Sequence, residues 1–167
     1  MKIFKVGIAG YGIVGKRRHQ YINEHQNLCV TAVCDQSLSN DYQGFPGIAC
    51  FNNFKDLLNT ELDVLFVCLP NNIAAEVTIA GLEKGLHVFC EKPPAFTGFD
   101  IIEIREAEKN SGKKLMYGFN HRHHDSIIRM KDIVDSGEYG KILWMRGRYG
   151  KSVSEDYFNN WRAKKEM

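Results

Sequence analysis

The chain has 167 residues, of which 44% are hydrophobic and 25% charged, proportions that are ordinary for a folded protein and exclude an intrinsically disordered one. Its formal net charge of +2 is too small, and its basic residues too scattered, to indicate a nucleic-acid or membrane partner. This length accommodates one full domain but not two of average size.

No apolar stretch reaches the length of a membrane span, and the first residues lead into a glycine-rich turn where a signal peptide would carry an apolar segment. We therefore expect a cytoplasmic protein. The five cysteines form no Cys-x-x-Cys pair and lie mostly in apolar segments, a pattern that indicates buried, reduced thiols.

Six short apolar segments alternate with longer, helix-like ones. They span residues 3–9, 28–34, 48–51, 63–69, 86–90 and 114–119. Several are rich in Val, Ile, Leu and Cys without strict alternation, which is typical of strands whose two faces are both covered by helices. The predicted fold class is α/β, a Rossmann doubly wound parallel sheet.

Two of the intervening segments carry apolar residues at helical spacing. The first contains Ile73, Val77 and Ala80, and the second Ile101, Ile104 and Ala107. Candidate ends are Asn72 and Gly85 for the first helix, and Thr97 with Asp100, then Gly112, for the second. Both helices are expected to lie on the sheet.

The pattern changes near residue 120. A polar stretch over residues 120–126 precedes a predicted helix with Ile127, Met130 and Val134 facing inward, and then a strand-like segment over residues 141–150. A single strand with unpaired edges is not a stable unit. We therefore predict a first domain over residues 1–120 and, over residues 121–167, the incomplete start of an α+β open-sheet domain.

A glycine-rich turn, Gly-x-Gly-x-x-Gly, joins the first predicted strand to a helix. Gly10 permits the tight turn, Gly12 lets the backbone approach a pyrophosphate, and Gly15 lets the helix pack against the strand. The N-terminus of the following helix would face the phosphate charge. The predicted cofactor-binding residues of the turn are Gly10, Tyr11, Gly12, Ile13, Val14 and Gly15.

Asp35 ends the second predicted strand, about twenty residues after the turn, where a carboxylate accepts hydrogen bonds from the adenosine ribose. The same charge would repel a 2′-phosphate, and residues 36–39, Gln-Ser-Leu-Ser, contain no cation to bind one. The cofactor is therefore expected to be NAD, in preference to NADP. An ordinary strand-to-helix turn is disfavoured because strand, glycines, helix and acid occur together.

Ligands of open parallel sheets bind beyond the carboxyl ends of the strands. After the fourth and fifth predicted strands, the candidate cofactor-binding residues are Leu69, Pro70 and Asn71, then Glu91 and Lys92. The Lys92 ammonium could hold a substrate hydroxyl or polarise a developing carbonyl near the nicotinamide. A surface lysine before a proline turn is the alternative interpretation.

These motifs, with the runs GLHVFCEKPPA, GFNHRHH and SGEYGKILWMRGRYG, resemble the Gfo/Idh/MocA family along the whole chain. The resemblance implies an NAD(P)-dependent oxidoreductase acting on the CH–OH groups of sugars, inositols and other polyols. It further implies that Lys92 is the catalytic, substrate-contacting lysine, flanked by Glu91 and Pro93 with a cis peptide bond before the proline.

The same resemblance implies that the NAD-binding Rossmann domain precedes a domain for substrate binding and oligomerisation. It implies that Asn120 contacts the cofactor and Arg122 the substrate, and that the full-length protein forms a homo-oligomer. The family's Asp-x-x-x-His pair has no counterpart here, although Trp161-Arg162 looks like the segment leading into it. We therefore expect NAD binding without the general base that turnover requires.

Two other clusters allow different chemistry. His121, His123, His124 and Asp125 carry potential zinc-ligand types, but the family resemblance explains them as the end of an interdomain strand, and no metal is expected. Cys90 could be a thiolate nucleophile, yet its apolar neighbours favour a buried strand cysteine.

Two other functions remain open at this point. The first is an NAD-binding sensor or scaffold without catalysis, which family membership alone does not exclude. The second is a different Rossmann reductase, which the Lys92-Pro93 pair disfavours. The residues that follow position 167 in the parent reading frame would separate an enzyme from a sensor.

Overall fold

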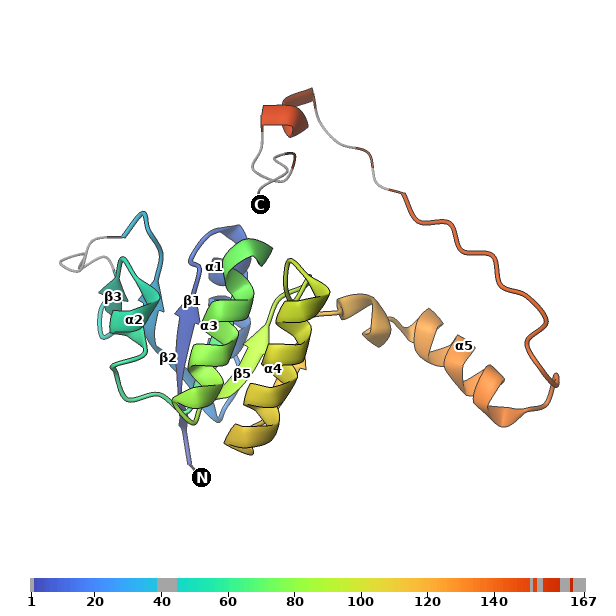
Figure 1. The fold of residues 1–167 in the computed structure, drawn as a ribbon, viewed down its shortest axis with the longest axis horizontal. Helices are drawn as coiled ribbons and strands as arrows, with labels where there is room; N and C mark the ends of the chain where they lie inside the picture. The colour runs from blue at the N-terminus through green and yellow to red at the C-terminus, as the bar shows by residue number, and fades with distance from the viewer. Residues whose placement is uncertain (1, 39–44, 151, 153–154, 160–162, 164–167) are drawn as a thin grey trace. The chain divides into compact units, whose positions relative to one another are not determined.

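The computed structural model describes residues 2–38, 45–150, 152, 155–159 and 163 (Figure 1). The chain divides into two compact units, Met1–Gly118 and Phe119–Met167. The first unit holds the sheet and the helices that pack on it. Among its described residues, the second unit holds one longer helix and two short 3-10 helices.

The first unit is built on a six-stranded sheet in the order β3-β2-β1-β4-β5-β6. The strands are β1 (Phe4–Ala9), β2 (Leu28–Cys34), β3 (Ala49–Phe51), β4 (Val64–Val67), β5 (His87–Cys90) and β6 (Leu115–Tyr117). All five neighbouring pairs are parallel. The predicted doubly wound sheet is confirmed, and its strand order reverses between β1 and β4.

Helices cover both faces of this sheet, as the unalternated apolar strands indicated. They are α1 (Ile13–Asn23), α2 (Phe54–Leu57), α3 (Asn71–Glu83) and α4 (Gly98–Ser111). Figure 1 shows α3 and α4 together in front of the sheet, with α1 behind it. One buried cluster includes Val77 and Leu82 of α3, and the other includes Ile22 of α1. Each face of the sheet thus has its own core.

The predicted ends of α4 are confirmed. The Thr97 side chain accepts a hydrogen bond from the Asp100 backbone, and the Asp100 carboxylate accepts one from the Thr97 backbone, forming a capping box. Gly112 ends the helix in the left-handed conformation at φ 62°.

The predicted start of α3 is wrong by two residues. The N-cap is Pro70 and not Asn72, because the Pro70 carbonyl accepts hydrogen bonds from the backbone of Ile73 and Ala74. Gly85, at φ 77°, follows the C-cap of α3, as the sequence indicated.

All five cysteines are free thiols. Cys34, Cys50 and Cys90 are buried and Cys68 is partly buried, in agreement with the prediction, but Cys29 is exposed. Cys29 lies near the start of β2, outside the residues Ala32 to Cys34 that β3 pairs with. The sequence pattern could not show that this end of the strand is less covered.

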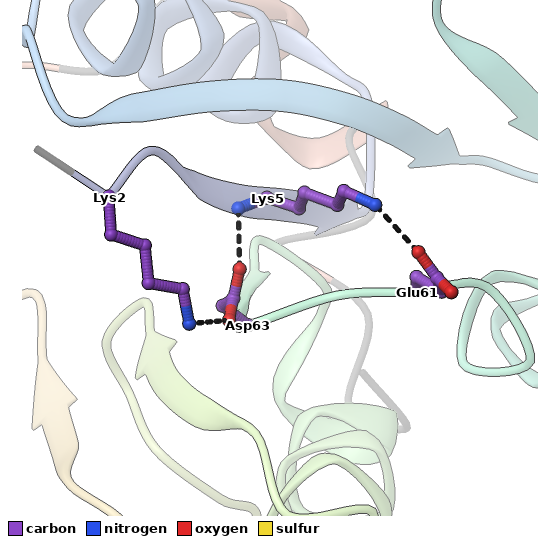
Figure 2. Close-up of polar contacts among 4 residues, drawn as sticks. All are labelled: Lys2, Lys5, Glu61 and Asp63. Atoms are coloured by element: carbon purple, nitrogen blue, oxygen red, sulfur yellow. Dashed lines mark hydrogen bonds and ion pairs between the residues drawn. The ribbon is translucent and has the colours of Figure 1, made fainter.

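Ion pairs join β1 to the segment before β4 at the amino ends of the strands (Figure 2). The Asp63 carboxylate accepts hydrogen bonds from Lys2 Nζ at 2.7 Å and from the Lys5 backbone N–H at 2.9 Å. Lys5 Nζ donates to Glu61 Oε2 at 2.7 Å. Because Asp63 N also donates to the Lys5 carbonyl, Asp63 holds the register at which β1 meets β4.

Replacing Asp63 with Asn is expected to lower the free energy of unfolding by about 1 kcal/mol at pH 7, the size of a partly exposed charge-assisted hydrogen bond. The hydrogen bond from Lys2 and then that from the Lys5 backbone lower the pKa of Asp63. The contribution of Asp63 to stability is therefore fully present at pH values above its pKa in the unfolded chain, about 3.9. It is lost as the pH falls through the lower pKa of Asp63 in the folded protein. Urea unfolding of the unmodified chain and of Asp63→Asn between pH 2 and 7 measures the difference in the free energy of unfolding.

The matched control is Glu61→Gln, which removes an ion pair whose acid is 89% exposed. We expect no measurable change in stability there, because exposed pairs are screened by water and salt. An Asp63→Asn protein as stable as the original at pH 7 would show that Asp63 does not hold the register.

The second unit contains a 3-10 helix η1 (Asn120–His123), the helix α5 (Asp125–Ser136) and a 3-10 helix η2 (Glu155–Asn159). The predicted strand over residues 141–150 is absent, because a strand forms only against a hydrogen-bonding neighbour and the described part of this unit offers none. Ile127, Met130 and Val134 of α5, which were predicted to face inward, are 38%, 55% and 49% exposed, because the described residues of this unit form no sheet against which they could pack.

Within the described residues, no helix combines the length and the apolar character needed to cross a bilayer.

Candidate dinucleotide-binding site

The predicted site residues of the first unit follow the carboxyl ends of four neighbouring strands. Gly10 follows β1, Asp35 follows β2, Leu69 and Pro70 follow β4, and Glu91 and Lys92 follow β5. Parallel strands end at the same edge of a sheet, so the fold brings these residues to one edge. The strand order reverses between β1 and β4, which is where ligands bind in folds of this class.

The three glycines of the turn have different spatial roles. Gly10 adopts φ +91°, and a Cβ there would lie 2.4 Å from the Cys68 carbonyl oxygen. A Cβ on Gly15 would lie 2.0 Å from the Gly10 carbonyl oxygen, so helix and turn approach too closely for any side chain. A Cβ on Gly12 would meet nothing within 4 Å. Gly10 and Gly15 therefore shape the turn, and Gly12 leaves it open toward a ligand.

The helix α1 begins at this open glycine. Gly12 is its N-cap in an extended conformation, with no side-chain cap and no acidic residue in the first turn. An uncapped helix N-terminus presents backbone N–H groups and the positive end of the helix dipole to an anion. Ile13, the first helical residue, is 81% exposed, and Val14 is partly buried. The turn can thus hold a pyrophosphate through its backbone.

The side chain of Tyr11 points into the protein. It is only 6% exposed, its hydroxyl lies 2.5 Å from His19 Nδ1, and its ring packs edge-to-face with the Phe45 ring at 5.2 Å between centroids. Tyr11 can therefore reach a cofactor through its backbone, while its ring anchors the turn to α1. Burial lowers the pKa of His19. Sequence reasoning did not find this contact.

The Asp35 carboxylate is held at the end of β2 by local hydrogen bonds. Its Oδ2 accepts from the Tyr11 backbone at 2.8 Å, and its Oδ1 accepts from the Ser37 backbone at 3.0 Å and hydroxyl at 2.7 Å. Burial alone would raise the pKa of Asp35, but the bonds from Ser37 and Tyr11 and the nearby Lys16 charge lower it overall. The group is a preorganised carboxylate at neutral pH.

Lys16 is a cation near Asp35 that the sequence pattern after β2 did not reveal, because it comes from α1. Residues 36–39 were predicted to offer no cation to a 2′-phosphate, and the last of them, Ser39, lies outside the described residues.

The segment after β4 starts α3. Leu69 packs against the buried cluster under α3, and Pro70 caps the helix. Asn71, the first residue of the helix, is partly buried. These residues lie at the correct edge for a cofactor contact.

The segment after β5 carries Glu91, Lys92 and Pro93. The peptide bond between Lys92 and Pro93 is cis, as predicted. Lys92 is exposed. The Glu91 carboxylate accepts a hydrogen bond from Arg18 Nε at 2.8 Å, across 73 positions of the sequence. Arg18 was missed by sequence reasoning, because nothing in the local pattern of α1 indicates a partner in the segment after β5.

Cys90 is fully buried, and burial raises the pKa of its thiol to about 11. The thiol is therefore protonated at neutral pH, and the structure favours the interpretation as a core cysteine over that as a nucleophile.

Asn120 and Arg122 belong to η1 of the second unit and are exposed. The Arg122 guanidinium carbon lies 5.8 Å from the centre of the Phe119 ring. In the same unit the rings of His121 and His124 are stacked at 5.1 Å. Among the described residues, no three His, Cys, Asp or Glu side chains form a potential metal site. Trp161-Arg162 lies outside the described residues.

The strand order, the open glycine turn and the carboxylate after β2 define the class of the first unit, a dinucleotide-binding Rossmann domain. The family model described as "Oxidoreductase family, NAD-binding Rossmann fold" matches residues 4–119. The chain belongs to this family, the Gfo/Idh/MocA oxidoreductases.

Known relatives agree with this assignment. The inositol 2-dehydrogenase of Salmonella paratyphi B is 33% identical over 161 residues, which cover 92% of this chain and 48% of that protein. The crystal structure of myo-inositol 2-dehydrogenase from Lactobacillus plantarum matches with a TM-score of 0.74 and 32% identity, over 85% of this chain and 44% of that one.

A scyllo-inositol dehydrogenase from Lactobacillus casei, crystallised with NAD(H) and scyllo-inositol, matches with a TM-score of 0.72 and 25% identity, over 83% of this chain and 43% of that one. The chain thus spans about half the length of the curated relatives it matches.

Proposed function

We propose that the chain is the cofactor-binding part of an NAD-dependent dehydrogenase, which transfers hydride between nicotinamide and the CH–OH group of a sugar or polyol. The proposal rests mainly on one observation: the open turn at Gly12, the carboxylate of Asp35 and the exposed Lys92 all lie at the same edge of the sheet. The relatives named for inositol oxidation support the substrate class.

The residues present fit a dinucleotide. The backbone N–H groups at the start of α1 would hold the pyrophosphate, because no side chain caps them and no Cβ blocks Gly12. Asp35 would accept hydrogen bonds from the adenosine ribose, and Leu69, Pro70 and Asn71 would line the rest of the cofactor. The family resemblance adds Asn120 as a cofactor contact. When bound, NAD supplies the carbon that accepts or donates hydride.

Lys92 is the catalytic residue of the proposal. Its ammonium would bind the substrate hydroxyl and stabilise the negative charge that develops on that oxygen as hydride leaves the carbon. The family resemblance adds Arg122 as a substrate contact. The Asp-x-x-x-His pair that family resemblance implies has no counterpart in the sequence, so we expect this chain to bind the cofactor without turnover.

We infer NAD in preference to NADP because the Asp35 carboxylate is charged and its position would face a 2′-phosphate. Residues 121–167 are proposed as the start of the substrate domain, through which a full-length protein would form a homo-oligomer. A cytoplasmic location, without nucleic-acid or membrane partners, stays a prediction.

Titration of the chain with NADH, followed by nicotinamide fluorescence and by calorimetry, tests the proposal. We expect saturable binding of NADH and at least about tenfold weaker binding of NADPH, because a like-charge contact at the partly buried Asp35 costs more than about 1.4 kcal/mol. Circular dichroism in the same buffer verifies that the protein is folded. A folded chain without saturable NADH binding would refute the proposed function.

A further inference from the structure

An ion pair links the helix that follows the glycine turn to the segment that carries Lys92. Arg18 of α1 and Glu91 after β5 have side chains that are 24% and 13% exposed. Arg18 Nε donates to Glu91 Oε1 at 2.8 Å, and a second guanidinium nitrogen pairs with the same oxygen. The Arg18 guanidinium carbon also lies 4.8 Å from the centre of the Phe89 ring. A pair so shielded from water is costly to break on one side only.

The structure leaves a defined space for the Glu91 carboxylate. A Cβ on Gly118 would lie 2.8 Å from Glu91 Oε2, so the missing side chain after β6 makes room for the acid. The Glu91 backbone N–H donates to the Val67 carbonyl at 2.8 Å, and the Gly118 N–H donates to the Cys90 carbonyl at 2.9 Å. Glu91 is therefore held by β4 and α1, and Gly118, directly after β6, leaves the space that its carboxylate occupies.

Lys92 has no comparable anchor. Its side chain is exposed, and the described part of the chain shows no hydrogen bond or ion pair to its ammonium. The placement of Lys92 therefore depends on its backbone, which continues directly from Glu91. A group that holds Glu91 in place also sets where the Lys92 side chain starts.

We propose that Glu91 and Arg18 are positioning residues: their ion pair couples the helix that binds the cofactor phosphates to the segment that places Lys92 at the nicotinamide. Arg18 lies on the same helix whose N-terminus would face the pyrophosphate, so one rigid element would contact both the cofactor and the segment that carries Lys92. Glu91 thus acts through Arg18 and Lys92, and not as a cofactor ligand. This inference rests on the proposed function.

The test compares the unmodified chain with Glu91→Gln, which keeps the size of the side chain but removes its charge. Acetylation of each lysine by acetic anhydride is followed by mass spectrometry, without NADH and at saturating NADH. We expect NADH to protect Lys92 in the unmodified chain. In Glu91→Gln the dissociation constant of NADH should rise about tenfold, the effect of losing one charge-assisted contact, and the protection of Lys92 at saturation should disappear.

Two further variants separate positioning from general damage. Arg18→Met should reproduce the Glu91→Gln result, whereas Arg18→Lys, which keeps the charge, should restore most of the protection. Gly118→Ala should also reproduce it, because the added Cβ would overlap the end of the Glu91 side chain, and not backbone, and would displace the carboxylate from Arg18. Glu61→Gln is the matched control, since it removes an ion pair at the opposite end of the strands.

The outcomes are distinct. If the unmodified chain fails to bind NADH, the proposed function fails first. If the unmodified chain binds NADH but its Lys92 is not protected from acetylation, the positioning role is wrong. It is also wrong if NADH protects Lys92 in Glu91→Gln, Arg18→Met and Gly118→Ala as strongly as in the unmodified chain. If the Glu91 and Arg18 variants melt at a lower temperature than the unmodified chain but NADH protects Lys92 in them equally well, the ion pair has a purely structural role. That result would also overturn the inference.

Discussion

Replacing Gly15 with alanine is expected to lower the free energy of unfolding by about 3 kcal/mol or more and to abolish NADH binding. The new Cβ would lie 2.0 Å from the Gly10 carbonyl oxygen, which is backbone and cannot turn aside as a side chain would. Relief of this overlap requires α1 to move away from the turn after β1, at the cost typical of severe overpacking. Urea unfolding measures the loss of stability, and NADH titration measures the loss of binding.

Gly12→Ala is the matched control, because it adds the same methyl group three residues earlier in the same turn. Its Cβ would meet no protein atom within 4 Å, so stability should fall by less than about 1 kcal/mol, the range for a changed N-cap. NADH affinity should still fall at least about tenfold, since the methyl group occupies the space proposed for the pyrophosphate. Equal stability losses in the two variants would contradict the roles assigned to Gly12 and Gly15.

Asp35→Ala is expected to weaken NADH binding about 100-fold, the largest effect of a single change outside the glycines. The substitution removes two proposed charge-assisted hydrogen bonds to the adenosine ribose, together worth about 3 kcal/mol. It also removes the acceptor of the Tyr11 backbone N–H, which helps to fix the glycine turn. Calorimetric titration with NADH and with NADPH measures the change, and the preference for NADH should largely disappear.

Ser37→Ala provides a graded control for Asp35. It removes the hydroxyl that donates to Asp35 Oδ1 at 2.7 Å but leaves the carboxylate and the other two hydrogen bonds in place. NADH affinity should fall only about threefold. Because the pKa of Asp35 is lowered overall, NADH binding should not change between pH 5 and 8 on account of this group. An Asp35→Ala protein with undiminished affinity would exclude Asp35 from the ribose contact.

Local patterns determined most of the first unit. The six apolar segments are the six strands of the sheet, and Thr97 with Asp100 caps α4, because hydrophobic burial and capping depend on residues close in sequence. The positions of Asp35 and Lys92 at one edge also followed from sequence, since parallel strands share the edge at which they end.

Other features could be read only from the tertiary structure. Three contacts join residues that are distant in sequence or carry no local signature. They are the Arg18–Glu91 ion pair, the Tyr11–His19 contact and the hydrogen bond from the Lys5 backbone to the Asp63 carboxylate. The strand expected over residues 141–150 did not form. An apolar pattern indicates which residues can form a strand, but a strand exists only where another strand supplies its hydrogen bonds.

The sequence by itself thus determined the α/β class of the chain, its glycine turn and the polar residues that follow its strands. The tertiary structure decided which of those polar groups are already engaged within the protein: Glu91 is paired with Arg18, while Lys92 is exposed. The physical reason is that spacing along a chain specifies which edge a side chain reaches, whereas its partner there is set by the packing of helices on the sheet.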